Sequence, residues 1–521
     1  MAAAGSLRGS RAPVAADDPL ASRAPPLAGR GSPPSSVAMS ADADFPKWVL
    51  LETYVFRRDD DESFPDENDA PIRASGTTTW GADFRIAFAV AKPPRISRLY
   101  AQLPQPGFLG PDEGNPLAML ATHRHLALFR VGTYPPTRLL LQNFFIYSSA
   151  DNGLLKMLPP CREPSFDYTR PNGRRPTHPK APPRLLNTSS LGLWCGLGED
   201  FVVVELSLYI PSNRLTVFAD ICLLRSSCTP GRQLGGRWES MRVEILSGDD
   251  PDEHELWQLS CWRTETIIPF GQWLCWVDYN RGILFCDMSE LQGPPTISFL
   301  MFPVDKFPLT SNRIGTWSSR YRGVSVVSHG RELKFVNVTR QDDIPLGALK
   351  PGTGFTITCH TLDVLGWCSG MRLPWKVDYK VTSDELWHTN PQLPPNILMF
   401  PRVDIDRPDV VHFLYIEFGY ANKNMWTVSI DMSTKAAESF SVYIDRKDSP
   451  RSDDGDFTMK KSMSPWPFLP CEFPEFLHLS SLAGRGGDET SGAIMCKKEE
   501  KNMPRKYIQI GSMPVEICWP N

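Results

Sequence analysis

The residues Gln272–Met288, rich in tryptophan and cysteine, carry the clearest β-strand pattern of this chain. Apolar side chains fill every position of Trp273–Val277, which is typical of a strand buried on both faces. Asp278–Gly282 then supplies turn-forming residues, and Ile283–Phe285 returns to β-branched and aromatic side chains. We therefore predict a β-hairpin over residues 272–288, closed by a five-residue loop in which Gly282 takes a positive φ.

Short strand-like segments recur along most of the chain, and turn-forming residues separate them. Outside the hairpin, the predicted strands are Trp48–Phe56, Phe84–Val90, His125–Val131, Leu139–Tyr147, Phe201–Tyr209, Leu215–Leu224, Trp238–Leu246, Thr296–Pro303, Gly323–Val327, Leu333–Val338, Phe355–Thr361, Trp375–Val381, Ile397–Phe400, Val410–Ile416, Trp426–Ile430 and Phe440–Ile444. The 49 prolines suit strands and loops better than long helices, and no amphipathic helix of ordinary length carries caps at both ends. The sequence predicts an all-β protein with many short antiparallel strands.

The spacing of the tryptophans favours one all-β architecture. Trp194, Trp238, Trp276, Trp317 and Trp367 recur at intervals in the range expected for propeller blades, roughly 40–50 residues. The residues around them do not repeat as a motif. We expect a β-propeller-like body, with stacked β-sandwiches as the alternative.

Composition divides the chain into three parts. Residues 1–44 have almost no large apolar side chains, and we predict a disordered extension. Residues 45–448 hold the all-β body, which includes a proline- and arginine-rich insertion at 159–186 that we expect to be a mobile surface loop. Residues 449–521 form a polar, partly disordered tail, which either supplies a closing strand or stays outside the fold.

Charge and cysteine content limit the partners and the compartment. Lysine and arginine (55) nearly balance aspartate and glutamate (59), so nucleic acid is not expected as a partner. No run of residues has the length and apolarity of a membrane span. The twelve cysteines are scattered, which favours a reducing intracellular compartment, cytoplasmic or nuclear. The alternative is an organelle, with residues 1–38 as a transit peptide; a start at Met39 also remains open.

Several strings of residues resemble one family. They are Trp48–Glu52, Asn143–Tyr147 with Leu158–Pro160, Gly198–Val204, Leu223–Ser226, Cys275–Asp287 and Arg407–Phe413. In this order they resemble the plant domain-of-unknown-function 1618 family, which is expanded in grasses, and the resemblance runs from about Trp48 to about Ile444. The strand-rich pattern of that family is similar to that of F-box-associated and kelch-like propellers. The resemblance implies an interaction role and carries over no catalytic or ligand-binding residue.

One short motif matches a nucleophile pattern. Gly366–Gly370 places Cys368 at the centre of G-x-nucleophile-x-G, and His360 or His388 is a conceivable base. That chemistry requires a strand, a sharp turn and then a helix. Because Pro374 follows closely, we expect a loop between strands instead.

Histidines and acids elsewhere offer weaker candidates. His123 and His125 would share a face if they lay on one strand, but no cluster of metal-ligand spacing completes a zinc site. His329 and His412 are single, and we expect them to be satisfied structurally. The acids Asp278 and Asp287, with Asn280, flank the hairpin, and turn formation with Arg281 as an ion-pair partner explains them better than a paired-carboxylate site.

These observations lead to no assignment of catalytic, cofactor-binding or metal-ligating residues, and to no expected cofactor. The function that we expect is a non-enzymatic protein-interaction module with a protein partner of unknown identity. Loops at 59–74 and 159–186 would present its binding surface. The alternatives are a substrate adaptor in protein turnover, by analogy with F-box-associated domains, and an enzyme or sugar-binding protein with a central-channel site.

Overall fold

The structure is a computed structural model, and all the residues that it describes belong to one compact unit of the chain, Ala41–Asn521. The described residues are 46–108, 110, 116–133, 141–149, 155–166, 183–196, 200–211, 216–226, 236–246, 253–289, 293–304, 318–342, 344, 347–368, 374–416, 425–443, 468–476, 507–510 and 513–516. The predicted extension at 1–44 and most of the predicted tail lie outside them.

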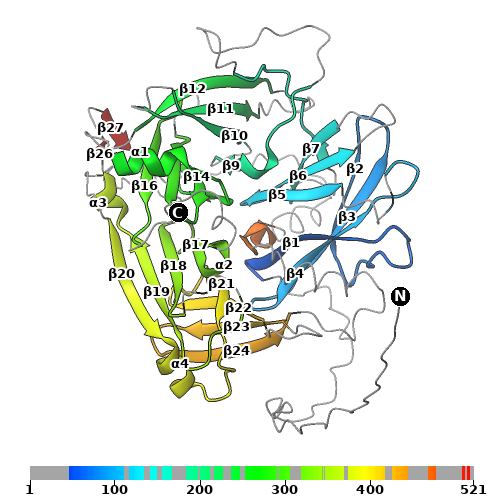
Figure 1. Ribbon diagram of the computed structural model, residues 1–521. Coiled ribbons are helices and arrows are strands. Elements are labelled where there is room, and N and C mark those ends of the chain that lie inside the picture. The colour runs from blue at the N-terminus through cyan, green and yellow to red at the C-terminus, as the bar shows by residue number, and fades with distance from the viewer. Residues whose placement is uncertain are drawn as a thin grey trace, which may run out of the picture. The chain divides into compact units, whose positions relative to one another are not determined.

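Within these residues the strands form five larger sheets and a two-stranded hairpin. The eight-stranded sheet consists of two four-stranded meanders, so we describe six blades, numbered 1 to 6 (Figure 1). Blade 1 has the order β2 (Ile72–Thr77), β3 (Asp83–Ala89), β4 (Ile96–Gln102), β1 (Val49–Arg57) and β25 (Leu469–Cys471). Blade 2 contains β5 (Leu117–His123), β6 (Leu126–Thr133), β7 (Leu141–Ser148) and β8 (Leu155–Met157). Blade 3 contains β9 (Leu191–Cys195), β10 (Phe201–Tyr209), β11 (Phe218–Arg225) and β12 (Trp238–Leu246).

The second half of the chain repeats this four-stranded unit. Blade 4 contains β13 (Thr266–Phe270), β14 (Trp273–Asp278), β15 (Gly282–Asp287) and β16 (Ile297–Met301). Blade 5 contains β17 (Arg322–Val327), β18 (Glu332–Arg340), β19 (Phe355–Leu362) and β20 (Trp375–Thr382). Blade 6 contains β21 (Leu398–Val403), β22 (Val410–Ile416), β23 (Met425–Asp431) and β24 (Ala436–Val442). A separate hairpin pairs β26 (Tyr507–Ile510) with β27 (Met513–Glu516).

Blades 2 to 6 are each an antiparallel meander of four consecutive strands, and the first strand of each contacts the first strand of the next, from β5 through β9, β13 and β17 to β21. The core lies between neighbouring blades rather than inside one sandwich. Phe302 and Phe335, for example, stack with 4.1 Å between ring centroids where blades 4 and 5 meet. Parallel pairing of β12 with β16 also joins blades 3 and 4. This arrangement is the expected all-β, propeller-like fold.

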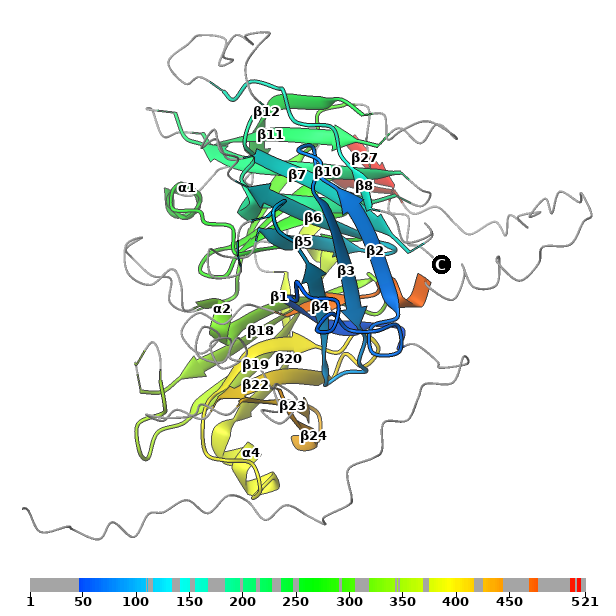
Figure 2. The same ribbon diagram turned by 90° about the vertical axis from the view of Figure 1, so that its right-hand side faces the viewer.

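Blade 1 combines strands that are far apart in the chain (Figure 2). β1 pairs in parallel with β4, and on its other side it pairs antiparallel with β25, so that Val49 lies opposite Cys471. Blade 6 packs against this junction, because Arg402 donates from Nε to the carbonyl oxygen of Phe468 at 3.1 Å. Residues 469–471, within the predicted tail, thus supply a closing strand.

The predicted hairpin over residues 272–288 forms, as β14 and β15. Its loop is shorter than the predicted five residues, because Asp278 and Gly282 are themselves a ladder pair and only three residues lie between them. The prediction of a positive φ at Gly282 is wrong. A Cβ at this position would lie 2.1 Å from the carbonyl oxygen of Leu300 in β16. Glycine is required there because the neighbouring strand approaches closely.

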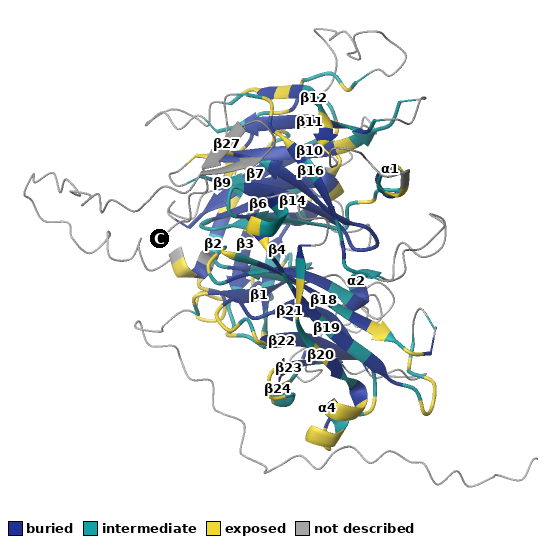
Figure 3. Ribbon diagram, turned by 90° about the vertical axis from the view of Figure 1, so that its left-hand side faces the viewer, coloured by how far each residue is buried: buried dark blue, intermediate teal, exposed yellow. Residues whose placement is uncertain are grey.

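Short helices interrupt the strands. They are α1 (Glu253–Ser260), α2 (Ser318–Tyr321), α3 (Val364–Cys368) and α4 (Ser383–Thr389). Much of α4 is exposed, whereas the blade strands are mostly buried (Figure 3). A capping box of Thr382 and Glu385, which was not predicted, begins α4.

Two expectations about architecture need correction. The tryptophan spacing does not mark a repeated blade position, since Trp194 lies in β9, Trp238 in β12 and Trp367 in α3. The ends of the 159–186 insertion are not mobile surface: Cys161 and Leu186 are buried in the core between blades 2 and 3. Residues 167–182 lie outside the described residues.

Candidate functional site

The turn of the β14–β15 hairpin holds a buried ion pair. Asp278 is fully buried, and its Oδ2 accepts hydrogen bonds from Arg281 Nη1 at 2.9 Å and from the backbone N–H of Arg263 at 2.7 Å. Its Oδ1 accepts the backbone N–H of Asn280 at 2.9 Å, which closes the turn. The expected ion pair of Arg281 therefore forms with Asp278. Both carboxylate oxygens are used in holding the turn.

A second carboxylate and a second arginine surround the next residue of the turn. Glu265 Oε2 accepts the backbone N–H of Tyr279 at 2.9 Å, and Arg322 Nη1 donates to the Tyr279 carbonyl oxygen at 2.6 Å. Burial, reinforced by the charge of Asp278, raises the pKa of Glu265 to about 8. Burial also lowers the pKa of Arg322 to about 10. The two acids and two arginines form one desolvated network.

The same turn connects three blades. The Tyr279 hydroxyl accepts from Arg402 Nη1 of β21 at 3.4 Å, and the hydroxyl of Ser318 in α2 donates to the Asn280 side chain. Arg322 begins β17 and also donates from Nε to Asn337 at 3.1 Å. The hairpin turn thus links blade 4 to blades 5 and 6, and perturbed pKa values mark a structural junction here.

Asp287 does not join this network. It lies opposite Trp273 at the other end of the hairpin, whereas Asp278 lies opposite Gly282. Its two oxygens accept from Gln272 Nε2 at 3.1 Å and from the backbone N–H of Ser289 at 2.8 Å. The two acids considered as a paired-carboxylate site are therefore separated by the length of the hairpin.

The nucleophile pattern around Cys368 has different geometry from the one its chemistry needs. Residues 364–368 form α3, so the prediction of a loop over 366–370 is wrong for its first three residues; the others lie outside the described residues. Cys368 ends this helix, and burial raises the pKa of its thiol to about 11. Because a reactive thiol needs a lowered pKa, as at a helix N-terminus, Cys368 is poorly placed for attack.

The two histidines considered as its base lie apart from one another. His360 is a buried residue of β19 that pairs with Phe335 across the ladder, and burial lowers the pKa of its imidazole. His388 lies exposed in α4. Among the described residues, no hydrogen bond joins Cys368 to either of them.

His123 and His125 do not share a strand face. β5 ends at His123, and His125 lies in the two-residue turn with Arg124, whose φ is 51°. His123 is half-buried: its Nδ1 accepts the backbone N–H of Cys195 at 2.8 Å, and desolvation lowers the pKa of its imidazole to about 3. Within the described ranges, no group of three or more His, Cys, Asp or Glu residues is placed to hold a metal ion.

A serine, a histidine and an aspartate meet in blade 6, which the sequence analysis did not predict. His412 Nδ1 lies 2.7 Å from Ser429 Oγ, and its Nε2 lies 3.2 Å from Asp404 Oδ2. The order of serine, histidine and aspartate is that of a catalytic triad, but the two ring nitrogens are exchanged, because in the triad Nε2 faces the serine and Nδ1 faces the aspartate. All three side chains are buried, with relative exposures of 4%, 1% and 6% for His412, Ser429 and Asp404. The His412 ring also packs on Trp48, with 5.8 Å between ring centroids, so the group fastens blade 6 to the start of β1.

His329, by contrast, is exposed in the turn after β17, with a φ of 54°. We expected both histidines to be satisfied structurally, but among the described residues no hydrogen bond is formed by the side chain of His329 as it is by that of His412. To predict the Ser429–His412–Asp404 group in blade 6 from the sequence, one would need the register of β22 against β23, which places His412 opposite Ser429.

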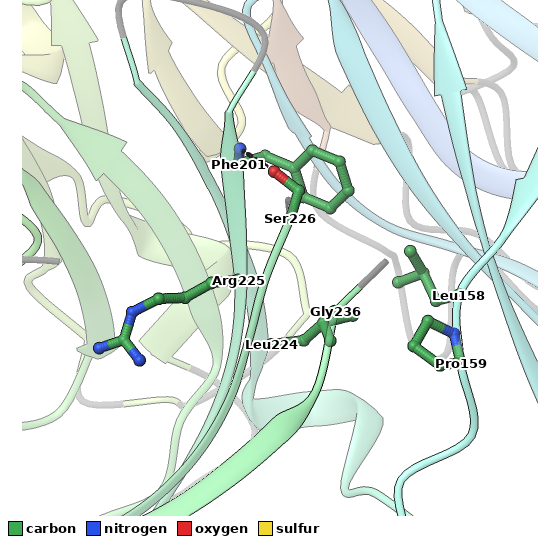
Figure 4. Close-up of a pocket in the computed structure, with 7 residues that line it drawn as sticks. All are labelled: Leu158, Pro159, Phe201, Leu224, Arg225, Ser226 and Gly236. Atoms are coloured by element: carbon green, nitrogen blue, oxygen red, sulfur yellow. Dashed lines mark hydrogen bonds between the residues drawn. The ribbon is translucent and has the colours of Figure 1, made fainter. Parts of the chain in front are cut away.

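A shallow hollow lies between blades 2 and 3 (Figure 4). Leu158 and Pro159, which follow β8, face Phe201, Leu224 and Gly236 of blade 3 across a narrow gap that has no room for a water molecule. Pockets that bind small molecules usually have volumes of roughly 300–1,000 Å³. The hollow is smaller than such a pocket, and it is lined mainly by carbon.

Blade order and core define an all-β protein of the propeller-like class. Residues 276–412 match the model of the family described as "Protein of unknown function (DUF1618)". The match contains most of the hairpin string Cys275–Asp287 and is shorter than the span that the resemblance predicted. No curated protein matches the chain. No helix among the described residues is long and apolar enough to cross a membrane.

Solved structures give distant similarities. The β-propeller domain of Nup133 from Vanderwaltozyma polyspora is 12% identical, with 62% of this chain and 74% of that chain covered, and a TM-score of 0.25. The α-L-arabinofuranosidase PaAbf62A from Podospora anserina is 8% identical, with 59% and 85% covered and a TM-score of 0.21. A levansucrase variant from B. megaterium is 10% identical, with 63% and 82% covered and a TM-score of 0.23.

Proposed function

We propose that this chain is a non-enzymatic protein-interaction module of plants, and that the outer edge of blade 6 is its main contact surface. The absence of catalysis is part of this proposal. In support of it, the Ser429–His412–Asp404 group is buried, burial raises the pKa of the Cys368 thiol, and the hollow between blades 2 and 3 is small.

The exposed apolar side chains of β24 are the observation that carries the proposal. Phe440 and Val442 are 45% and 56% exposed, and they lie two residues apart on one face of the strand. Phe440 stacks on Trp426 with 5.7 Å between ring centroids. Exposed apolar side chains beside one another on a strand are typical of a contact surface.

The position of β24 indicates how a partner would bind. β24 is the last strand in the order of blade 6, and no described strand pairs with its outer edge. An edge strand offers unpaired N–H and C=O groups to an extended segment of another protein, and its alternate side chains provide specificity. The partner is therefore a protein with an exposed, extended apolar segment.

Affinity capture with matched variants tests the proposal. The full chain and the double variant Phe440→Glu, Val442→Lys are used as bait in plant extracts, and Leu365→Glu serves as the control, because Leu365 is 58% exposed in α3 on another blade. We expect wild type and control to retain the same protein, and the double variant to lose it at least tenfold. Recovery of no reproducible partner, with or without stress, or equal recovery by all three baits, would overturn the proposal. A direct pull-down with ubiquitin-ligase subunits separates an adaptor from other interaction modules.

The proposed place of action is inside the cell, in the cytoplasm or nucleus. The cysteines within the described ranges are all free thiols, in keeping with a reducing compartment. A fluorescent protein fused to the C-terminus, with and without residues 1–38, distinguishes this location from an organelle reached through a transit peptide. Loss of organellar signal on deletion of residues 1–38 would favour the organelle.

A further inference from the structure

Two cysteine sulfurs face each other between blades 2 and 3. Sγ of Cys161 lies 3.6 Å from Sγ of Cys222, and the two residues are only 4% and 1% exposed. Cys161 follows β8 of blade 2, whereas Cys222 lies in β11 of blade 3. The sulfurs of two blades, 61 residues apart in the chain, are thus already in contact.

Hydrogen bonds hold both partners in place. The Cys161 carbonyl oxygen accepts the backbone N–H of Arg184 at 2.8 Å, and the Pro159 carbonyl oxygen accepts the indole N–H of Trp238 at 2.7 Å. Cys222 lies in the centre of a ladder that pairs it with Glu205 and Ser240. A disulfide has an S–S length of about 2.05 Å, so closing the bond needs sulfur movements of only about 1.5 Å in total.

We propose that Cys161 and Cys222 form a redox-sensitive pair, which closes to a reversible disulfide when the protein meets hydrogen peroxide. The proposal is independent of the interaction surface on blade 6. It concerns a covalent link between blades 2 and 3.

Cys161 is the thiol that reacts first. Its hydrogen bond with Cys222 lowers the pKa of Cys161, and the backbone N–H of Glu163 and the charge of Arg184 act in the same direction, against the opposing effects of burial and of the Glu205 charge. Buried cysteines elsewhere behave differently: burial raises the pKa of Cys195 and of Cys359 to about 12. Since the thiolate is the form that peroxide oxidises, Cys161 is favoured over these thiols.

The hollow described above borders the same core cluster as the pair. Its walls include Leu158 and Leu224, which belong to the same core cluster as both cysteines. Leu224 is two residues from Cys222 in β11 and shares its face of the strand.

The reaction balances with one peroxide for each disulfide. The Cys161 thiolate attacks one peroxide oxygen, an S–O bond forms and the O–O bond breaks, and the leaving hydroxide takes up a proton to give water. Cys222 sulfur then attacks the sulfenic sulfur of Cys161; the S–S bond forms, the S–O bond breaks, and the departing hydroxide takes the Cys222 proton as a second water. The two thiols lose two electrons, and the peroxide gains them.

Thiol mapping of the full chain tests the proposal. The folded protein is treated with hydrogen peroxide, its remaining thiols are alkylated, and its peptides are analysed by mass spectrometry before and after dithiothreitol. We expect a Cys161–Cys222 linked peptide that dithiothreitol removes, together with a rise in the thermal midpoint that dithiothreitol reverses. Cys261→Ser is the matched control, because Cys261 is more exposed and has no sulfur partner among the described residues; this variant should form the same link.

Variants of the pair separate the two steps. In Cys222→Ser, the oxidised Cys161 cannot form the disulfide, so dimedone should label it as a sulfenic acid; in Cys161→Ser, neither product should form at Cys222. Cys195 reports on unfolding, because it is buried and, among the described residues, its sulfur bonds only to the His123 carbonyl oxygen. The proposal is overturned if, in wild type, the thiols of Cys161 and Cys222 can still be alkylated completely after peroxide treatment. It is also overturned if peroxide removes these two free thiols no faster than that of Cys195. The wild-type measurement decides even if a variant fails to fold.

Discussion

Asp278 and Arg281 form an ion pair at the tip of the central hairpin, and neither side chain is more than 5% exposed. Removing one partner of a buried pair leaves the other charge without compensation, at a cost of about 3–5 kcal/mol. We therefore expect Asp278→Asn to lower the free energy of unfolding by that order, and chemical denaturation would measure it. The control is Glu438→Gln, which breaks the more exposed pair with Arg407 and should change stability by less than about 1 kcal/mol. Equal losses in the two variants would contradict this account.

Gly282 should tolerate no side chain, although its φ is ordinary. A Cβ would lie 2.1 Å from the carbonyl oxygen of Leu300, and such overpacking costs about 1–3 kcal/mol or more. Gly282→Ala should lower the thermal midpoint, and Gly282→Val should lower it further. Gly293 has nothing within 4 Å of its would-be Cβ, so Gly293→Ala should leave the midpoint nearly unchanged. If Gly282→Ala melts like wild type, β16 does not pass as close as described.

Glu265 should make the protein less stable as pH rises. The pKa of this carboxyl is raised to about 8 in the folded protein, from an ordinary 4.5. The folded form therefore keeps a proton that the unfolded chain releases, and the resulting stabilisation is complete below about pH 4.5 and is lost as pH rises toward 8. Glu265→Gln retains an oxygen to accept the Tyr279 N–H but lacks the titration.

Denaturation of wild type and Glu265→Gln at several pH values measures this effect. The difference between their free energies of unfolding should change with pH by up to roughly 1.4 kcal/mol per pH unit between these limits. Curves that run parallel across that window would show that Glu265 keeps an ordinary pKa.

β25 should be necessary for a stable first blade. A chain ending at residue 476 retains β25, whereas one ending at residue 467 lacks it. The shorter chain exposes the edge of β1 and loses the buried side chains of Phe468 and Cys471, so it should be less stable by about 3 kcal/mol or more. Limited proteolysis and thermal melting compare the two chains. Identical behaviour would mean that β25 contributes little.

Ser429 should behave as a structural residue and not as a nucleophile. Its hydroxyl is 2.7 Å from His412 Nδ1 and is buried. Ser429→Ala should cost about 1–3 kcal/mol by leaving the imidazole without this partner. A fluorophosphonate probe should fail to label Ser429 in the folded protein. Labelling that disappears in Ser429→Ala would instead identify a serine enzyme.

The local sequence pattern was sufficient to predict those strands whose own residues strongly favour β structure. The hairpin of β14 and β15 and the long strand β10 were predictable because β-branched and aromatic residues fill them. β2 (Ile72–Thr77) and β9 (Leu191–Cys195) were missed, since small residues and glycine weaken their pattern. β13 was missed because Pro269 interrupts its five residues.

Long-range contacts explain the remaining errors. The need for glycine at position 282 comes from β16, and the meeting of His412 with Ser429 depends on strand register. Neither is visible in a local window. The pairing of Asp278 with Arg281 was predictable because the two residues are three apart in one turn. The contribution of Glu265 was not, because this residue lies just before β13, outside the hairpin.

The pairing of Val49 with Cys471 has a consequence for how the chain is made. During synthesis, β1 leaves the ribosome early, and its partner β25 follows more than 400 residues later. At a synthesis rate of roughly 5–20 residues per second, the edge of β1 has unpaired hydrogen-bonding groups for tens of seconds. We expect nascent chains to depend on chaperones during this interval, and the folding of blade 1 to be the last step of biogenesis.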